Sequence, residues 1–235
     1  MKHIEGIWHL LKKNKLHNKG RGKFFFPILK ILFFLIEIPL IIGFTYSFFL
    51  VLKMYIDITA EKMFFIVGIF IFIVIRLLIE GFTKHSFRFV DNFEHEVTHI
   101  VFSWAFLKRV KKLVVTGKVG GSVEVEGDNL ITRLSPYFFP LTSYILLIPY
   151  PFLQIGYRKF DLFLVGIAYG IHIISTIKDI HIDQPDLKRG GFIFSMVFVI
   201  LMNLIFAGIL FSIPISSQHI GDFLITGVVS ILGMF

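Results

Sequence analysis

Long apolar stretches separated by short polar stretches dominate the pattern of this chain. They predict about six transmembrane helices, because a helix of about 20 mostly apolar residues spans the hydrocarbon core of a bilayer. The predicted fold class is therefore mainly α, a polytopic helical membrane protein. The predicted spans are residues 24–52, 63–78, 137–153, 162–177, 192–213 and, as a shorter stretch, 223–235.

Three further segments have other patterns. Residues 1–23 place apolar side chains at helical spacing before a basic cluster and predict an amphipathic segment on the membrane surface. Residues 92–107 predict a short helix with Asp91 or Asn92 as its N-terminal cap. Residues 113–126 are rich in β-branched side chains around a Gly-Gly pair and predict a β-hairpin.

These patterns divide the chain into four parts. An interfacial segment and an accessory first span with its outer loop precede a membrane core, and one C-terminal span follows it. The predicted boundaries are 1–23, 24–62, 63–213 and 214–235.

Composition supports a membrane location and limits the chemistry. Of the 235 residues 55% are hydrophobic, 30 of them are Phe, and the formal net charge is +8. In a membrane protein a basic excess first marks the cytoplasmic side, so we expect a lipid bilayer and no nucleic acid as partner. We place the N-terminus and residues 81–135 and 178–190 on the cytoplasmic side of a cell (inner) membrane. The absence of Cys excludes disulfides, thiolate metal sites and a cysteine nucleophile.

The short helix carries the sequence His95-Glu96-Val97-Thr98-His99, an HExxH motif. Residues four apart lie on one face of a helix, so the two imidazoles can coordinate one Zn²⁺. Glu96 lies about 100° round the helix and is placed to act as the general base on the water that zinc activates. The motif therefore predicts a zinc-dependent peptide hydrolase.

A third protein ligand is needed, and several residues qualify. Asp186 is the first choice because it follows Pro185, which breaks the preceding helix, and returns to the membrane face where His95 lies. His172 is the main rival, since an imidazole at its depth in a membrane helix needs a partner. Asp179 and Asp183 remain further alternatives.

Three segments in this order resemble the site-2 protease family of intramembrane zinc metalloproteases. They are HEVTH at 95–99, the glycine-containing hairpin at 113–126 and the segment 184–191, which reads QPDLKRGG. The resemblance covers residues 63–213. It implies a membrane metalloprotease core that cleaves peptide bonds in or near a transmembrane segment of a membrane-protein substrate.

The resemblance also implies roles for individual residues. His95, His99 and Asp186 would be the zinc ligands, and Glu96 the catalytic base. The hairpin would offer an edge to which an unwound substrate segment can add as a strand. A function of another class fits the same motif, namely a non-catalytic membrane scaffold or regulator that retains a metal site.

Overall fold

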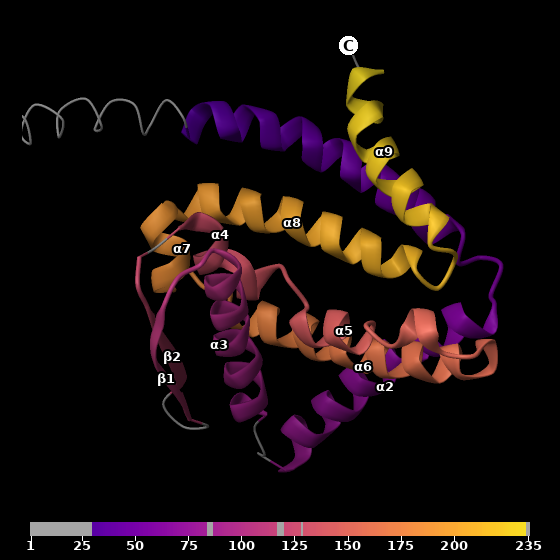
Figure 1. Cartoon of the computed structure of the whole chain (residues 1–235), viewed down its shortest axis with the longest axis horizontal. Helices are drawn as coiled ribbons and strands as arrows, with labels where there is room; N and C mark the ends of the chain where they lie inside the picture. Colours follow the sequence, from indigo (N-terminus) through magenta and orange to yellow (C-terminus); the bar gives the residue numbers. More distant parts are fainter. Residues whose placement is uncertain (1–29, 84–86, 117–119, 128, 234–235) are drawn as a thin grey trace, which may run out of the picture.

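The structure, a computed structural model, describes residues 30–83, 87–116, 120–127 and 129–233. It is mainly helical and contains one small antiparallel sheet of two strands. The amphipathic segment predicted at 1–23 lies outside the described residues. After the helix Lys30–Lys53, which Figure 1 leaves unlabelled, the elements are α2 (Ala60–Thr83), α3 (Arg88–Ala105), β1 (Val110–Thr116), β2 (Gly120–Val125), α4 (Leu130–Leu134), α5 (Leu141–Leu146), α6 (Ile155–Asp179), α7 (Pro185–Gly190), α8 (Phe192–Ser212) and α9 (Gln218–Leu232).

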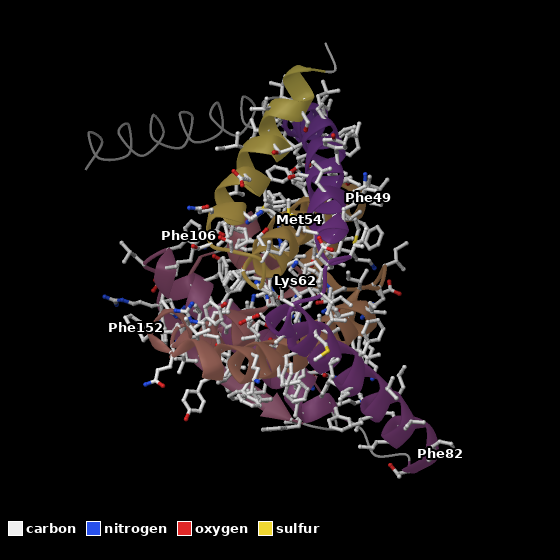
Figure 2. The ribbon with its side chains drawn as sticks, turned by 90° about the vertical axis from the view of Figure 1, so that its right-hand side faces the viewer. Phe49, Met54, Lys62, Phe82, Phe106 and Phe152 are labelled. Carbon is white, nitrogen blue, oxygen red and sulfur yellow. The ribbon has the colours of Figure 1, made fainter. Side chains whose placement is uncertain are left out.

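Within this described part, four helices are long and apolar enough to cross a membrane: Lys30–Lys53, α2, α6 and α8. Their outward side chains are apolar, as a lipid environment requires. Phe49 and Phe82, for example, lie on the outside of the ribbon (Figure 2) and are 58% and 84% exposed. The chain therefore has the helices of a membrane protein, but the predicted count of six is not confirmed.

The single span predicted at 137–153 is wrong. This stretch holds the six-residue helix α5 and a separate 3-10 turn at Tyr150–Phe152, and another such turn ends at Tyr137. Prolines at 136, 140, 149 and 151 explain the breaks, because proline lacks a backbone N–H and clashes with the preceding helical turn. The last predicted span corresponds to α9, which has only 15 residues.

Two spans, α2 and α6, pack closely and run in the same direction. A Cβ atom added at Gly68 would overlap the carbonyl oxygen of Phe163, and one added at Gly166 would overlap that of Phe65. Small residues allow this approach of two membrane helices, where packing contributes much of the association. Near their C-terminal ends, Lys178 Nζ lies 2.5 Å from Glu80 Oε2. The segments that follow α2 and α6 therefore begin at the same end of this pair.

We expect Gly68→Ala to destabilise the fold. The added methyl group meets backbone rather than a movable side chain, so the cost should be about 1–3 kcal/mol of unfolding free energy. Gly81→Ala is the matched control, because a Cβ at Gly81 of the same helix meets nothing within 4 Å. Reversible unfolding in detergent measures both variants, and equal stabilities would show that the two helices do not meet at Gly68.

The segment around Tyr137 is fixed beneath α8. The side-chain amide of Asn203 donates to the carbonyl oxygen of Tyr137 at 2.8 Å, and Phe138 stacks on Phe206 with ring centroids 5.7 Å apart. Lys30 Nζ donates to the carbonyl oxygen of Gly190 at 2.7 Å. Helix α8 and the first helix therefore support the short elements that bring the candidate site together.

Helix α3 runs across the direction of α6 and α8 (Figure 1). Its N-terminal half is held by a buried ion pair, in which Arg76 donates from both terminal nitrogens to Asp91 at 2.8 and 2.5 Å. Ser175 Oγ of α6 also donates to Asp91, at 2.7 Å. Pairing satisfies both charges where water is scarce. This pair therefore ties α3 to both α2 and α6.

The predicted caps of α3 are wrong. The helix begins at Arg88, before both Asp91 and Asn92, and no side chain caps it. Asp91 is instead occupied by the buried guanidinium of Arg76, and Asn92 Nδ2 donates to the carbonyl oxygen of Thr116 at 2.9 Å. Tertiary partners therefore use both side chains that the sequence offered as caps.

The predicted hairpin is present with shifted bounds. Strand β1 begins at Val110, and the Gly-Gly pair starts β2. Gly120 and Gly121 pair with Thr116 and Val115. The side chain of Asn92 thus fixes the hairpin against α3 near the point where these glycines pair.

Candidate metal centre

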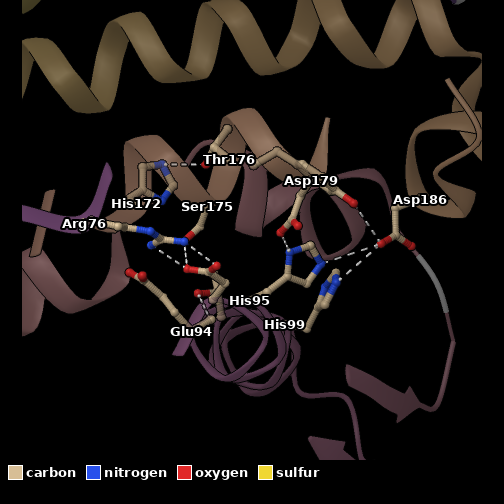
Figure 3. A network of polar contacts seen from close by, with 12 residues as sticks. Arg76, Glu94, His95, His99, His172, Ser175, Thr176, Asp179 and Asp186 are labelled. Carbon is tan, nitrogen blue, oxygen red and sulfur yellow. Dashed lines mark hydrogen bonds and ion pairs between the residues drawn. The ribbon is translucent and has the colours of Figure 1, made fainter. Parts of the chain in front are cut away.

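His95 and His99 meet Asp186 at the point where α3 faces α7 (Figure 3). Asp186 Oδ2 lies 4.0 Å from His95 Nε2 and 3.6 Å from His99 Nε2. One ligand atom from each residue lies within 4.8 Å of the other two. Among the residues that the structure describes, this is the group with the composition and spacing of a metal site.

The other nitrogen of each imidazole is held by an acceptor. His95 Nδ1 lies 3.0 Å from Asp179 Oδ2, and His99 Nδ1 lies 2.9 Å from the carbonyl oxygen of Thr132. A carbonyl oxygen and an ionised carboxylate accept hydrogen bonds only, so each neutral ring carries its proton on Nδ1. The lone pairs of both Nε2 atoms then face Asp186, because hydrogen bonds from the other ring nitrogen orient histidines that bind zinc in this way.

The distances suit a small tetrahedral ion. Zn²⁺ binds histidine nitrogen and carboxylate oxygen at about 2.0–2.2 Å, which separates tetrahedral ligand atoms by roughly 3.4 Å. The two distances from Asp186 to the imidazole nitrogens are slightly longer, so a small contraction brings the three ligands to an ion. Two neutral imidazoles and one carboxylate form a donor set typical of catalytic zinc.

Asp186 is positioned by local structure and by a buried phenol. It stands in the first turn of α7 directly after Pro185, the first residue of that helix. Tyr137, which is completely buried, donates from its hydroxyl to Asp186 Oδ2 at 3.4 Å. Its ring also lies edge-on to His95, 5.1 Å between centroids. Burial of Asp186 favours its neutral form, but the hydrogen bonds with His95 and His99 outweigh this and lower the pKa of the carboxyl.

The alternative third ligands lie in other surroundings. Asp179 contacts His95 on Nδ1 and therefore orients a ligand. His172 is buried in α6 with Nε2 3.4 Å from Thr176 Oγ1 and is separate from the group around Asp186 (Figure 3). Asp183 is exposed and accepts from Lys188 Nζ at 2.6 Å. Among the described residues, the group of possible ligand atoms therefore includes Asp186, the first choice of the sequence prediction, while Asp179 reaches this group through His95 Nδ1.

Glu96 lies beside the group and beneath the hairpin. It is 7% exposed, and its carboxylate interacts electrostatically with His95 and His99. Burial is the largest influence and raises the pKa of Glu96 above its usual value. A Cβ atom at Gly121 of β2 would lie 2.5 Å from Glu96 Cγ and 2.7 Å from Oε1. The absence of a side chain at Gly121 therefore leaves room for the glutamate.

If Glu96 is the base, we expect Gly121→Ala to lower activity while zinc stays bound. The new methyl group would displace the Glu96 carboxylate, and a shift of about 1 Å in a reacting group costs roughly 10²-fold in rate. Ser122→Ala is the control, because Ser122 is the exposed next residue of the strand. Cleavage rate and zinc content of the two variants check this, and normal cleavage by Gly121→Ala would contradict the placement of Glu96.

The metal-free site should bind a proton that competes with the metal. Burial disfavours charged His95, but hydrogen bonds with Asp179 and Asp186 prevail and raise its pKa to about 9. Below that pH the ring is protonated, so its Nε2 must release a proton before it binds zinc. We expect zinc affinity to rise about tenfold per pH unit between pH 6 and 8. Calorimetric titration at several pH values measures this, and a pH-independent affinity would contradict it.

Several contributors to the site were missed by the sequence prediction. The sequence prediction placed Tyr137 in a span and gave Thr132 no role, because no local sequence pattern indicates the contacts that either residue makes. Asp179 was recognised as a possible ligand, but which imidazole nitrogen it contacts depends on how α6 ends beside α3. Contacts between distant elements thus decide these roles.

Comparison with known proteins adds no relative. No model of a known protein family matches the chain, and neither the curated proteins nor the solved structures give a match. Inference about function therefore depends on the motif and on the geometry of the site.

Proposed function

We propose that this protein is an intramembrane zinc metalloprotease of the site-2 protease type. The observation that carries the proposal is the convergence of both imidazole Nε2 atoms and Asp186 Oδ2, with the opposite nitrogens held by acceptors. If the HExxH sequence had arisen by chance, we would not expect a carboxylate from a segment about 90 residues away to lie against both of its imidazoles. The neighbouring Glu96, which is buried and interacts electrostatically with both imidazoles, is the base that we propose for peptide hydrolysis.

The contacts around the site support a separate role for each of its residues. Zinc held by His95, His99 and Asp186 would acidify water and polarise the peptide carbonyl. Glu96 takes the proton from the attacking water and delivers it to the leaving amine. Its raised pKa favours this role, because a carboxylate with a higher pKa is a stronger base and accepts the proton of the water more readily. Asp179 and the Thr132 carbonyl keep the two ligand rings in place.

The fold supports a substrate from within the membrane. The site lies where α3, α7 and the end of α6 meet, near the common end of the spans α2 and α6. A transmembrane helix must unwind before hydrolysis, and its freed backbone groups need partners. The two-stranded hairpin beside Glu96 supplies a strand edge for such a segment. We propose that cleavage occurs near the cytoplasmic end of the substrate helix.

The proposal is tested with purified protein in proteoliposomes that contain single-span test substrates. The expected result is cleavage in or next to the substrate span, located by mass spectrometry and abolished in a His95→Ala/His99→Ala variant that lacks zinc. Stoichiometric zinc that persists in the double variant would contradict the assigned site. Zinc bound through these residues without cleavage of any substrate would favour the non-catalytic scaffold or regulator.

A further inference from the structure

Helix α3 has its polar and apolar faces reversed relative to a helix on a water-soluble protein. Its buried residues are mostly polar and include Asp91, Glu94, Thr98 and His99. Phe89, Phe93 and Trp104 are instead 54%, 49% and 62% exposed. Their spacing places these three aromatic side chains within about 60° of one another round the helix. These aromatic side chains form an outward apolar stripe at the two ends of α3, while Ile100, between them on the same side, is 8% exposed.

The turn that ends α3 extends this stripe. Leu107 has a φ of 55° and is 96% exposed, and Phe106 beside it is 44% exposed and points outward (Figure 2). The backbone N–H of Lys108 donates to the carbonyl oxygen of Ser103, a helix ending that usually places glycine where Leu107 stands. A leucine in a strained backbone and fully exposed would be doubly unfavourable in water. Contact with lipid removes the second of these costs.

The position of this turn matches the boundary of a bilayer. Phe102, near the end of α3, packs on Phe138, which in turn packs on Phe198 of α8. Phe198 lies six residues into α8, or roughly 9 Å along the span. Interfacial helices bury their apolar face to about 5–10 Å. With the first residue of α8 at the membrane surface, the C-terminal end of α3 lies at the depth where acyl chains meet headgroups.

Basic side chains follow immediately. Arg109, Lys111 and Lys112 are exposed at the start of β1, which lies with its hairpin at the end of the molecule where α7 joins α6 to α8 (Figure 1). Lys111 has an exposed carboxylate partner, Glu124, at 4.0 Å. Such a weak surface pair leaves the side chain able to exchange its partner for a phosphate. Apolar anchors followed by exposed cations are the pattern of a segment that binds an anionic membrane surface.

We infer that the turn at 104–107 and the cations at 109–112 form a binding surface for anionic phospholipid. The aromatic and leucine side chains enter the acyl boundary, and the three cations contact the phosphates of the headgroups. This surface would fix the depth of α3, and with it the depth of the candidate metal centre. It is independent of whether the protein cleaves peptides, since Trp104 lies about 140–180° round the helix from His95 and His99.

Fluorescence of Trp104 tests this inference. The chain has two tryptophans, Trp8 and Trp104, so full-length Trp8→Phe protein reports on the turn alone, and Trp104→Phe gives the contribution of Trp8. In vesicles that contain brominated lipid, we expect bromines near the headgroup end of the acyl chain to quench Trp104 more than bromines near the chain terminus. Brominated phosphatidylglycerol should associate roughly fivefold or more tightly than brominated phosphatidylcholine, the effect of one cation at an anionic surface.

The preference for phosphatidylglycerol should be lost when the three cations are replaced or when salt screens them. In an Arg109→Gln/Lys111→Gln/Lys112→Gln variant, or in 1 M salt, the two brominated lipids should quench equally. Equal quenching by both lipids in the protein that keeps Arg109, Lys111 and Lys112 would overturn the proposed headgroup preference. Quenching by neither lipid would show that protein, such as a second copy of the chain, covers the turn, and would overturn the inference altogether.

Discussion

Glu96→Gln is expected to abolish nearly all cleavage while the protein keeps its zinc. Glutamine has the shape of glutamate but cannot accept a proton, so the rate should fall by the roughly 10²–10⁴-fold that general acid–base catalysis contributes. The ligands His95, His99 and Asp186 are untouched, so about one zinc per chain should remain. Cleavage in proteoliposomes and elemental analysis of the same sample measure the two quantities.

A matched control separates the loss of the base from general disturbance of α3. Glu94→Gln alters the other buried glutamate of this helix, which accepts from the backbone N–H of Thr142 at 3.4 Å and is not a member of the group His95, His99 and Asp186. We expect it to keep far more activity than Glu96→Gln. Full activity in Glu96→Gln would end the protease proposal, whatever the zinc content.

Asp186→Ala is expected to have the largest effect on metal binding among the single variants outside the HExxH motif. It removes one of three ligands and leaves the hydroxyl of Tyr137 without its acceptor. Altering a residue that merely supports a ligand typically costs 10–100-fold in metal affinity, so loss of a ligand should cost at least roughly 100-fold. Competition with a chelating zinc indicator measures the affinity, and the cleavage rate at limiting zinc should fall in parallel.

His172→Ala is the control, because it alters the main rival for the third position. His172 contacts Thr176 one turn along its own helix, apart from the ligand group, so zinc affinity should stay within a few-fold of the unaltered protein. The opposite result, with normal affinity in Asp186→Ala and loss in His172→Ala, would move the third ligand to α6. Asp179→Asn should weaken binding less than Asp186→Ala, because it orients His95 without binding the ion.

The grouping of His95, His99 and Asp186 follows from local sequence signals. HEVTH places two imidazoles on one helical face by geometry alone, and Pro185 marks the start of the helix that presents Asp186. These features depend on residues within a few positions of one another.

The sequence prediction failed where contacts between elements far apart in the chain determine the structure. Hydropathy alone favoured a span at 137–153, but prolines interrupt it and place Tyr137 under Asp186 instead. The sequence predicted Asp91 as a helix cap, but its carboxylate instead accepts hydrogen bonds from Arg76, fifteen residues earlier. Asp179 and Asp186 have the same chemistry, and only the packing of α6 and α7 against α3 assigns one to Nδ1 of His95 and the other to the imidazole Nε2 atoms.

Cleavage measured as a function of bound zinc tests the central claim most directly. Protein stripped with a chelator and reconstituted with a single-span substrate should be inactive. Added zinc should restore cleavage in proportion, up to about one zinc per chain, and Glu96→Gln loaded with the same zinc should remain inactive. Cleavage at the full rate by stripped protein, or restoration that does not depend on His95 and His99, would contradict the account.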